Sequence, residues 1–166
     1  MPKIAFLMDP IETLSVKKDS TLAMIAAAQQ RGLDVFYLQQ DVLVLADGVV
    51  TALTCPVKLR SDFCETLDPQ TAGADWYQLG NEQAIALAEM DIVMRRKDPP
   101  FDLEYIYSTY LLERADAEGV MVVNRPSALR DCNDKLFATL FPQCCTELIV
   151  SRRMDQVKAF HIQHAN

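Results

Sequence analysis

The sequence predicts an α/β fold with a mostly parallel sheet and flanking helices. Along its 166 residues, short apolar runs of strand length alternate with longer segments rich in helix-forming residues. Residues 3–38 follow the order strand, loop, helix and strand, which is the order of a β-α-β unit. The first 38 residues therefore predict the start of a parallel sheet.

The elements of this first unit have recognisable limits. Residues 3–8 are an apolar run, residues 11–18 have loop character, and residues 33–38 are rich in β-formers. Between them, Asp19 can cap an alanine-rich helix that Gly32 ends. We expect two strands and one helix here.

The middle of the sequence departs from this alternation. Residues 41–53 contain two β-rich runs around Asp47-Gly48, which is a hairpin signal and predicts a small antiparallel excursion. Residues 61–90 have no clear period and predict a surface insertion containing one short strand or helix.

Alternation resumes after this insertion. Residues 90–94 and 120–123 are expected to be buried strands, with a helix between Asp102 and Gly119. Residues 127–140 predict helix in one or two pieces, and residues 147–150 predict a last strand. A final helix capped by Ser151 and reaching His161 is expected after that strand.

Composition restricts the function classes. Half of the residues are hydrophobic, and the length suits one compact domain with a real core. The formal charge of −7 repels DNA and anionic membranes, so neither nucleic acid nor a membrane is an expected partner. The apolar run near the N-terminus is too short for a signal peptide or a membrane span, which favours a cytoplasmic protein. Five cysteines without a C-x-x-C pair are expected to be reduced.

The common catalytic motifs are not present in these residues. The five glycines are scattered, so no glycine-rich phosphate-binding loop is formed. The two histidines, His161 and His164, have no cluster of thiols or carboxylates at ligand spacing nearby, and a metal site is not expected.

Three polar loops remain, each placed directly after an apolar strand. They comprise residues 9–20, 96–102 and 124–135, and charged strand ends at one edge of a parallel sheet can form a pocket. Each loop also has a purely structural interpretation, as a turn, an exposed strand end or an ordinary polar helix start. Pro99 and Pro100 favour a functional loop, since they restrict the backbone more than a simple connector requires.

Three longer segments resemble a known family. FLMDPIETLSVKKDSTLAM, MRRKDPPFDLEYIYSTYLLERA and VVNRPSALRDCNDKLFATLF are similar to the N-terminal part of the bacterial glutathione synthetases, which are ATP-grasp ligases. The resemblance runs from Lys3 to about His164 and is weakest between residues 41 and 89. Arg95 departs from the pattern, because an apolar residue is expected at its position.

This resemblance implies a Rossmann-like pre-ATP-grasp domain in residues 1–122, with residues 123–166 as a linker and the first elements of a truncated ATP-grasp domain. It implies that the whole enzyme uses ATP and Mg²⁺ to join glycine to γ-glutamylcysteine through an acyl phosphate. The implied substrate-binding residues are Asp9, Pro10, Ser15, Arg96, Lys97 and Asp98, and Lys135 is the implied nucleotide contact. No catalytic or metal-binding residue of the family is expected within this chain.

Three hypotheses of different kinds follow. The chain could be a fragment of a glutathione synthetase that is inactive alone, with the whole enzyme a homo-oligomer. It could instead be a stand-alone module that binds a small carboxylate. A third possibility is a structural role in subunit contacts.

Overall fold

The structure is a computed structural model that describes residues 1–16, 18–60, 76–132 and 134–164. These residues belong to two compact units, Met1–Ala128 and Leu129–Asn166. Within the described residues, no helix combines the length and the apolar character needed to cross a bilayer.

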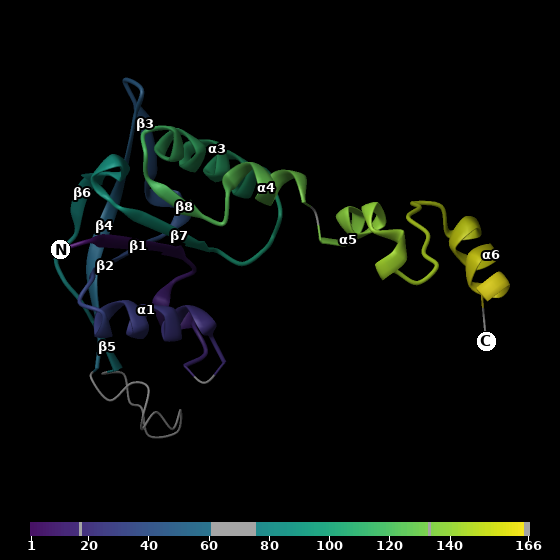
Figure 1. Cartoon of the computed structure of the whole chain (residues 1–166), viewed down its shortest axis with the longest axis horizontal. Helices are drawn as coiled ribbons and strands as arrows, with labels where there is room; N and C mark the ends of the chain where they lie inside the picture. The colour runs from purple at the N-terminus through teal and green to yellow at the C-terminus, as the bar shows by residue number, and fades with distance from the viewer. Residues whose placement is uncertain (17, 61–75, 133, 165–166) are drawn as a thin grey trace. The chain divides into compact units, whose positions relative to one another are not determined.

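The centre of the first unit is a parallel sheet. Its strands are β1 (Lys3–Met8), β2 (Asp34–Leu38), β7 (Ile92–Arg96) and β8 (Met121–Val123), and they lie side by side in the order β2-β1-β7-β8 (Figure 1). The predicted α/β, Rossmann-like fold with flanking helices is therefore confirmed.

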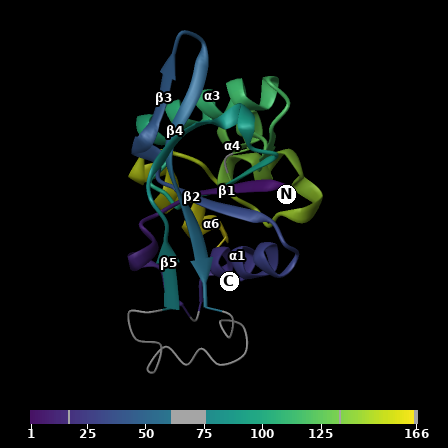
Figure 2. The same cartoon turned by 90° about the vertical axis from the view of Figure 1, so that its left-hand side faces the viewer.

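An antiparallel hairpin extends this sheet beyond β2. It consists of β3 (Leu43–Ala46) and β4 (Val49–Leu59), joined at Asp47 and Gly48, which both have positive φ angles of 51° and 83° (Figure 2). Two successive positive φ angles are typical of the two-residue turn predicted from Asp-Gly. The hairpin is confirmed, and β4 continues far enough to pair with β2 as well.

The prediction for residues 61–90 is wrong where the structure describes them. Residues 76–90 contain two strands, β5 (Tyr77–Leu79) and β6 (Gln83–Ala86), and both pair with β4. Ile85, Leu87 and Met90 are buried in the core, so this segment is part of the sheet structure and not a surface insertion. Residues 61–75 lie outside the described residues.

Two capped helices cover opposite faces of the sheet (Figure 1). Helix α1 (Ser20–Gln30) begins after Asp19, whose carboxylate accepts a hydrogen bond from the Thr21 amide at 2.7 Å. Helix α3 (Leu103–Ala117) begins after Asp102, whose carboxylate accepts from the Tyr105 amide at 2.9 Å. Both helix starts follow the prediction, because a side-chain acceptor satisfies a free amide of the first turn.

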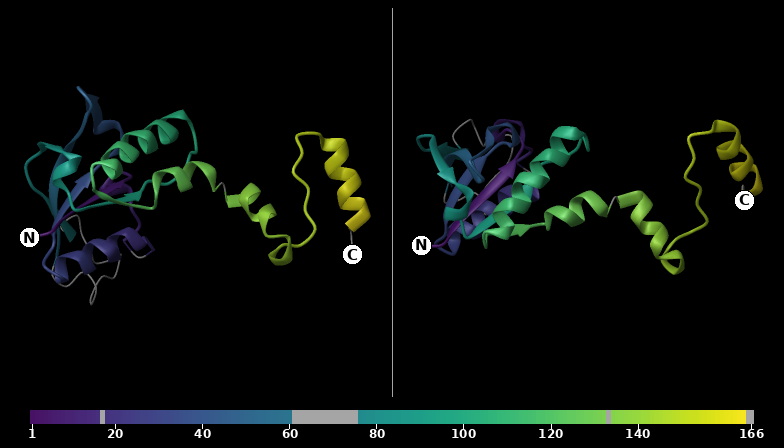
Figure 3. Two further views of the ribbon diagram at one scale, coloured as in Figure 1. Left: turned by 45° about the horizontal axis from the view of Figure 1, so that its top comes forward. Right: turned by 90° about the horizontal axis from the view of Figure 1, so that it is seen from above.

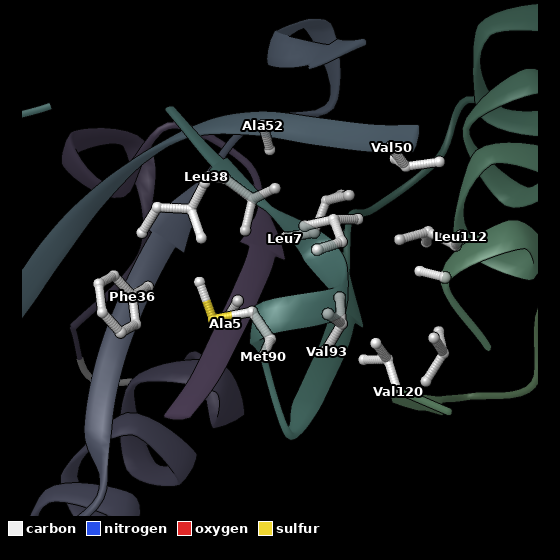
Figure 4. Close-up of a cluster of buried hydrophobic side chains, with 14 residues drawn as sticks. Ala5, Leu7, Phe36, Leu38, Val50, Ala52, Met90, Val93, Leu112 and Val120 are labelled. Atoms are coloured by element: carbon white, nitrogen blue, oxygen red, sulfur yellow. The ribbon is translucent and has the colours of Figure 1, made fainter. Parts of the chain in front are cut away.

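The core consists of one cluster on each face. Leu22 and Ile25 of α1 pack against Phe6 on one face. On the other face, Leu112 of α3 packs with a larger set of sheet residues (Figure 4), which includes Ala5, Leu7, Phe36, Leu38, Val50, Ala52, Met90, Val93 and Val120. Because both faces of β1 are covered, that strand is apolar almost throughout.

The remaining helices are α4 (Pro126–Asp131), α5 (Asp134–Phe137) and α6 (Met154–His164), and an irregular segment precedes α6 (Figure 3). The two-piece helical prediction for 127–140 and the final helix are confirmed in outline. The predicted strand at 147–150 is wrong, since no described residue of the second unit is in a strand and a lone strand has no partner for its backbone. Among the described residues, Cys55, Cys132, Cys144 and Cys145 are free thiols.

Candidate functional site

The candidate site lies where three parallel strands end at one edge of the sheet. Asp9 follows β1, Gln40 follows β2 and Lys97 follows β7. The chain leaves β1 toward α1 on one face and leaves β7 toward α3 on the other face. In open α/β sheets, such a divergence opens a crevice at the carboxyl ends of the strands.

Asp9 joins the loops that follow β1 and β7. Its Oδ1 lies 2.7 Å from the Lys97 ammonium nitrogen, and its Oδ2 accepts a hydrogen bond from the Asp98 amide at 3.0 Å. Lys97 also donates to the Asp98 carbonyl at 2.7 Å. The structure therefore brings together three of the residues that the resemblance implies.

A pocket of about 260 Å³ opens beside this Asp9–Lys97 pair. Its lining comes from all three strand ends and the first turn of α3, and comprises Met8, Asp9, Pro10, Gln39, Gln40, Asp41, Lys97 and Glu104. Three of the expected site residues, Asp9, Pro10 and Lys97, belong to this lining.

Arg96 and Ser15 lie toward α1 and do not line the pocket. The Arg96 guanidinium donates to the Ser20 hydroxyl at 3.0 Å and to the Thr21 hydroxyl at 3.3 Å. The Ser15 carbonyl accepts from the amides of Lys18 and Asp19, both at 2.9 Å. These two expected site residues therefore flank the N-terminus of α1.

Arg95 is a buried cation next to the pocket residue Gln40, and its contacts are not predicted from the sequence. Its side chain is only 5% exposed and stacks on Tyr105, with 3.6 Å between the guanidinium carbon and the ring centre. One guanidinium nitrogen, Nη2, donates to Gln40 Oε1 at 3.2 Å and to Ser108 Oγ at 3.1 Å. Burial lowers the pKa of Arg95 below its ordinary value, although Tyr105 and Asp9 oppose this shift.

A sequence signal for this arrangement exists in hindsight. Arg95 occupies an apolar strand position, and Tyr105 and Ser108 are three residues apart on the following helix, so they share one helix face. The partner after β2, Gln40, has no such signal, because its proximity to Arg95 depends on the sheet order.

Lys135 belongs to the other compact unit. It is an exposed residue of α5, whereas the other six expected site residues belong to Met1–Ala128.

The described residues contain no group of three or more histidine, cysteine, aspartate or glutamate side chains arranged to hold a metal ion. In this part of the chain, the pocket carboxylates of Asp9, Asp41 and Glu104 do not form such a group.

Comparison with known proteins identifies the family. Residues 2–130 match the family model of the prokaryotic glutathione synthetase N-terminal domain. The chain is 50% identical over 164 residues to a glutathione synthetase of Pseudomonas putida, covering 99% of this chain and 49% of that protein. It is 46% identical over 166 residues to the one of Vibrio cholerae, covering all of this chain and 49% of that protein. The chain thus spans about half the length of these curated relatives, and it belongs to the prokaryotic glutathione synthetase family.

Proposed function

We propose that the chain is the N-terminal portion of a glutathione synthetase and forms the part of its active site that holds γ-glutamylcysteine. The whole protein would join glycine to γ-glutamylcysteine, using ATP to activate the cysteinyl carboxylate as an acyl phosphate. The family membership supports this reaction and an ATP-dependent ligase. A cytoplasmic location is part of the same proposal.

The observation that carries the proposal is the pocket beside the Asp9–Lys97 pair. It lies where parallel strands end, which is the usual ligand position in an open α/β sheet. Its lining contains both a cation and several carboxylates, so it offers partners for a small zwitterionic peptide. Asp9 and Pro10 would shape the β1 side, and Lys97 and Asp98 the β7 side.

Arg96 and Ser15 would contact the peptide from the start of α1. In this role Arg96 provides a planar guanidinium that can pair with a substrate carboxylate through two parallel hydrogen bonds. Its present partners, the hydroxyls of Ser20 and Thr21, are neutral, so a carboxylate would be a stronger acceptor.

ATP and Mg²⁺ belong to the proposal for the whole protein. ATP supplies the phosphoryl group that activates the carboxylate. Within this chain we assign only Lys135 to the nucleotide, as a cation on α5 for the phosphates. The described residues provide no cluster suited to Mg²⁺, so we assign none of them to the metal.

Titration calorimetry of the chain with γ-glutamylcysteine tests the proposal. We expect saturable heat, and we expect Arg96→Ala to weaken binding about tenfold or more, since hydrogen bonds to charged groups contribute about 1.5–3 kcal/mol. The matched control is Arg114→Ala, an exposed arginine on α3.

Two outcomes would contradict this. No heat from the unaltered chain would remove the substrate-binding role. An unchanged affinity in Arg96→Ala, combined with a lower unfolding temperature, would show that Arg96 only secures the N-terminus of α1.

We also propose that these 166 residues do not complete the reaction alone and that the whole enzyme is a homo-oligomer. Release of ADP by the purified chain with ATP, Mg²⁺, γ-glutamylcysteine and glycine would contradict the first statement. Exposed Leu103, Tyr107 and Tyr110 on α3 support the second, because they present apolar area to a second copy. A mass in solution that stays monomeric at every concentration would speak against self-association through this part.

A further inference from the structure

Gln40 occupies a special position in the pocket. It begins the 3-10 turn Gln40–Val42, which follows β2 after Gln39, and it contributes to the pocket lining. Its Oε1 accepts a hydrogen bond from Arg95 Nη2 at 3.2 Å and lies 3.1 Å from Ser108 Oγ. Gln40 is half-buried, and its carboxamide oxygen contacts Arg95 of β7 and Ser108 of α3.

The chemistry of arginine fixes which end of this carboxamide faces the pocket. A guanidinium has only donors, so the oxygen of Gln40 must point to Arg95 and the nitrogen must point away. Among the described residues, Nε2 of Gln40 has no hydrogen-bond partner, and it is not among the buried unpartnered atoms. The amide group is therefore an accessible donor held in one orientation.

Two cations are associated with this pocket: Lys97 lines it, and Arg95, which is not part of the lining, contacts the lining residue Gln40. Arg95 is buried, and none of the described carboxylates forms an ion pair with it. Its partners are the neutral groups of Gln40, Ser108 and Tyr105. Lys97 is the second cation and is held in place by Asp9. Asp9 is the one carboxylate that acts electrostatically on Arg95 and is also the ion-pair partner of Lys97, so two cations share a single described counterion. This excess of positive charge favours a carboxylate of the ligand at this place.

The opposite charge lies at the rim. Asp41 and Glu104 both line the pocket with exposed side chains, and no described cation forms an ion pair with either of them. These carboxylates favour a ligand cation such as an ammonium group. A pocket of about 260 Å³ is small enough to suit one end of a small peptide.

We propose that this pocket binds the free α-amino-acid end of the peptide substrate. Gln40 Nε2 and Lys97 donate to the α-carboxylate, and Asp41 and Glu104 face the α-ammonium group. Arg95 and Ser108 are positioning residues that orient Gln40. The inference rests on the proposed function, because the γ-glutamyl end of γ-glutamylcysteine carries both groups.

Calorimetry with three compounds separates the contacts. γ-Glutamylcysteine carries both groups, 4-aminobutanoyl-cysteine lacks the α-carboxylate, and glutaryl-cysteine lacks the α-ammonium group. Gln40→Met keeps the shape of the side chain but removes the donor. We expect it to lower the affinity for γ-glutamylcysteine and for glutaryl-cysteine at least tenfold. Binding of 4-aminobutanoyl-cysteine should not change, and Gln30→Met on the exposed side of α1 is the matched control.

A second variant tests the two carboxylates at the rim of the pocket. The double variant Asp41→Asn/Glu104→Gln should bind γ-glutamylcysteine and 4-aminobutanoyl-cysteine more weakly. Its affinity for glutaryl-cysteine should stay the same or rise. The reason is that only the first two compounds present an ammonium group to the rim.

A double-mutant cycle tests the positioning role of Arg95. Introduced into the original sequence, Arg95→Met should weaken the binding of γ-glutamylcysteine. Introduced into Gln40→Met, it should have little further effect on binding, because the two residues act through one amide. A purely structural contribution of Arg95 would give the same loss in both backgrounds. Ser108→Ala, a smaller change at the same amide, carries the same expectation if Arg95→Met does not fold.

The results distinguish a wrong pocket assignment from a wrong proposed function. Unchanged affinity in a folded Gln40→Met, or an equal loss for all three compounds, overturns the pocket assignment and leaves the proposed function intact. No binding of any compound to the unaltered chain overturns both. If Gln40→Met does not fold, Gln40→Ala carries the same prediction.

Discussion

Tyr37 links burial to the pH dependence of stability. Its side chain lies in the core beside α1 with only 6% exposure. Burial raises the pKa of Tyr37 to about 12, because the phenolate would be poorly solvated there. In the unfolded chain the same group ionises near its ordinary pKa of about 10.

The consequence is a loss of stability in alkali. Below about pH 10 the tyrosine is neutral in both states and makes no pH-dependent contribution. Between about pH 10 and 12 only the unfolded state releases the proton, so the free energy of unfolding falls by roughly 1.4 kcal/mol per pH unit. Urea titrations of the unaltered chain and Tyr37→Phe from pH 7 to 11.5 measure this, since the variant lacks the contribution. Parallel pH curves for the two proteins would contradict it.

Single residues are predictable from the sequence where their role follows from their neighbours along the chain. Asp9 and Lys97 are recognisable as polar residues after apolar strands, and the structure joins them. Arg95 lies on β7 and Gln40 lies in the turn after β2, 55 positions away, and β2 and β7 are not neighbouring strands, so no local pattern reveals their contact.

The elements follow local signals to different degrees. Helices α1 and α3 are predictable because a capping aspartate and a terminal glycine mark both ends. Strand β4 is not predictable in full, since Pro56 lies within it and proline has no amide for strand pairing. Pairing with four other strands stabilises β4 nevertheless.

Packing of α3 predicts a strong asymmetry between its two faces. Leu112 is fully buried against the sheet, so Leu112→Ala should lower the free energy of unfolding by about 2–5 kcal/mol. Leu103 on the same helix is 69% exposed, and Leu103→Ala should change stability by less than about 0.5 kcal/mol. Urea unfolding of both variants provides the comparison. Similar losses for the two would show that α3 does not depend on sheet packing.

The whole chain divides at Ala128, slightly after the boundary expected at residue 122. Both hydrophobic clusters of the sheet lie entirely within the first unit. The sequence has no clear signal at this boundary, because apolar residues continue into the second unit, including the exposed Leu136, Leu140 and Phe141.

We expect residues 1–128 to unfold cooperatively at the same urea concentration as the whole chain. A shorter chain, residues 1–119, lacks β8 and the buried Val120 and Val122. Its free energy of unfolding should be lower by about 3 kcal/mol or more. Fluorescence of Trp76, the single tryptophan and a buried one, reports both transitions. If residues 1–128 are as unstable as 1–119, the first unit is not self-sufficient.

The central place of β1 also has a consequence for biosynthesis. A growing chain can join β1 to β2 once residue 38 has emerged, but the other edge of β1 must wait for β7, because Lys3 and Asp91 meet across 88 residues. During that interval the nascent protein presents an open strand edge, which is a template for association with other chains. The Asp9–Lys97 pair closes only after this interval, so a ribosome that stalls before residue 92 leaves an aggregation-prone intermediate without a ligand pocket.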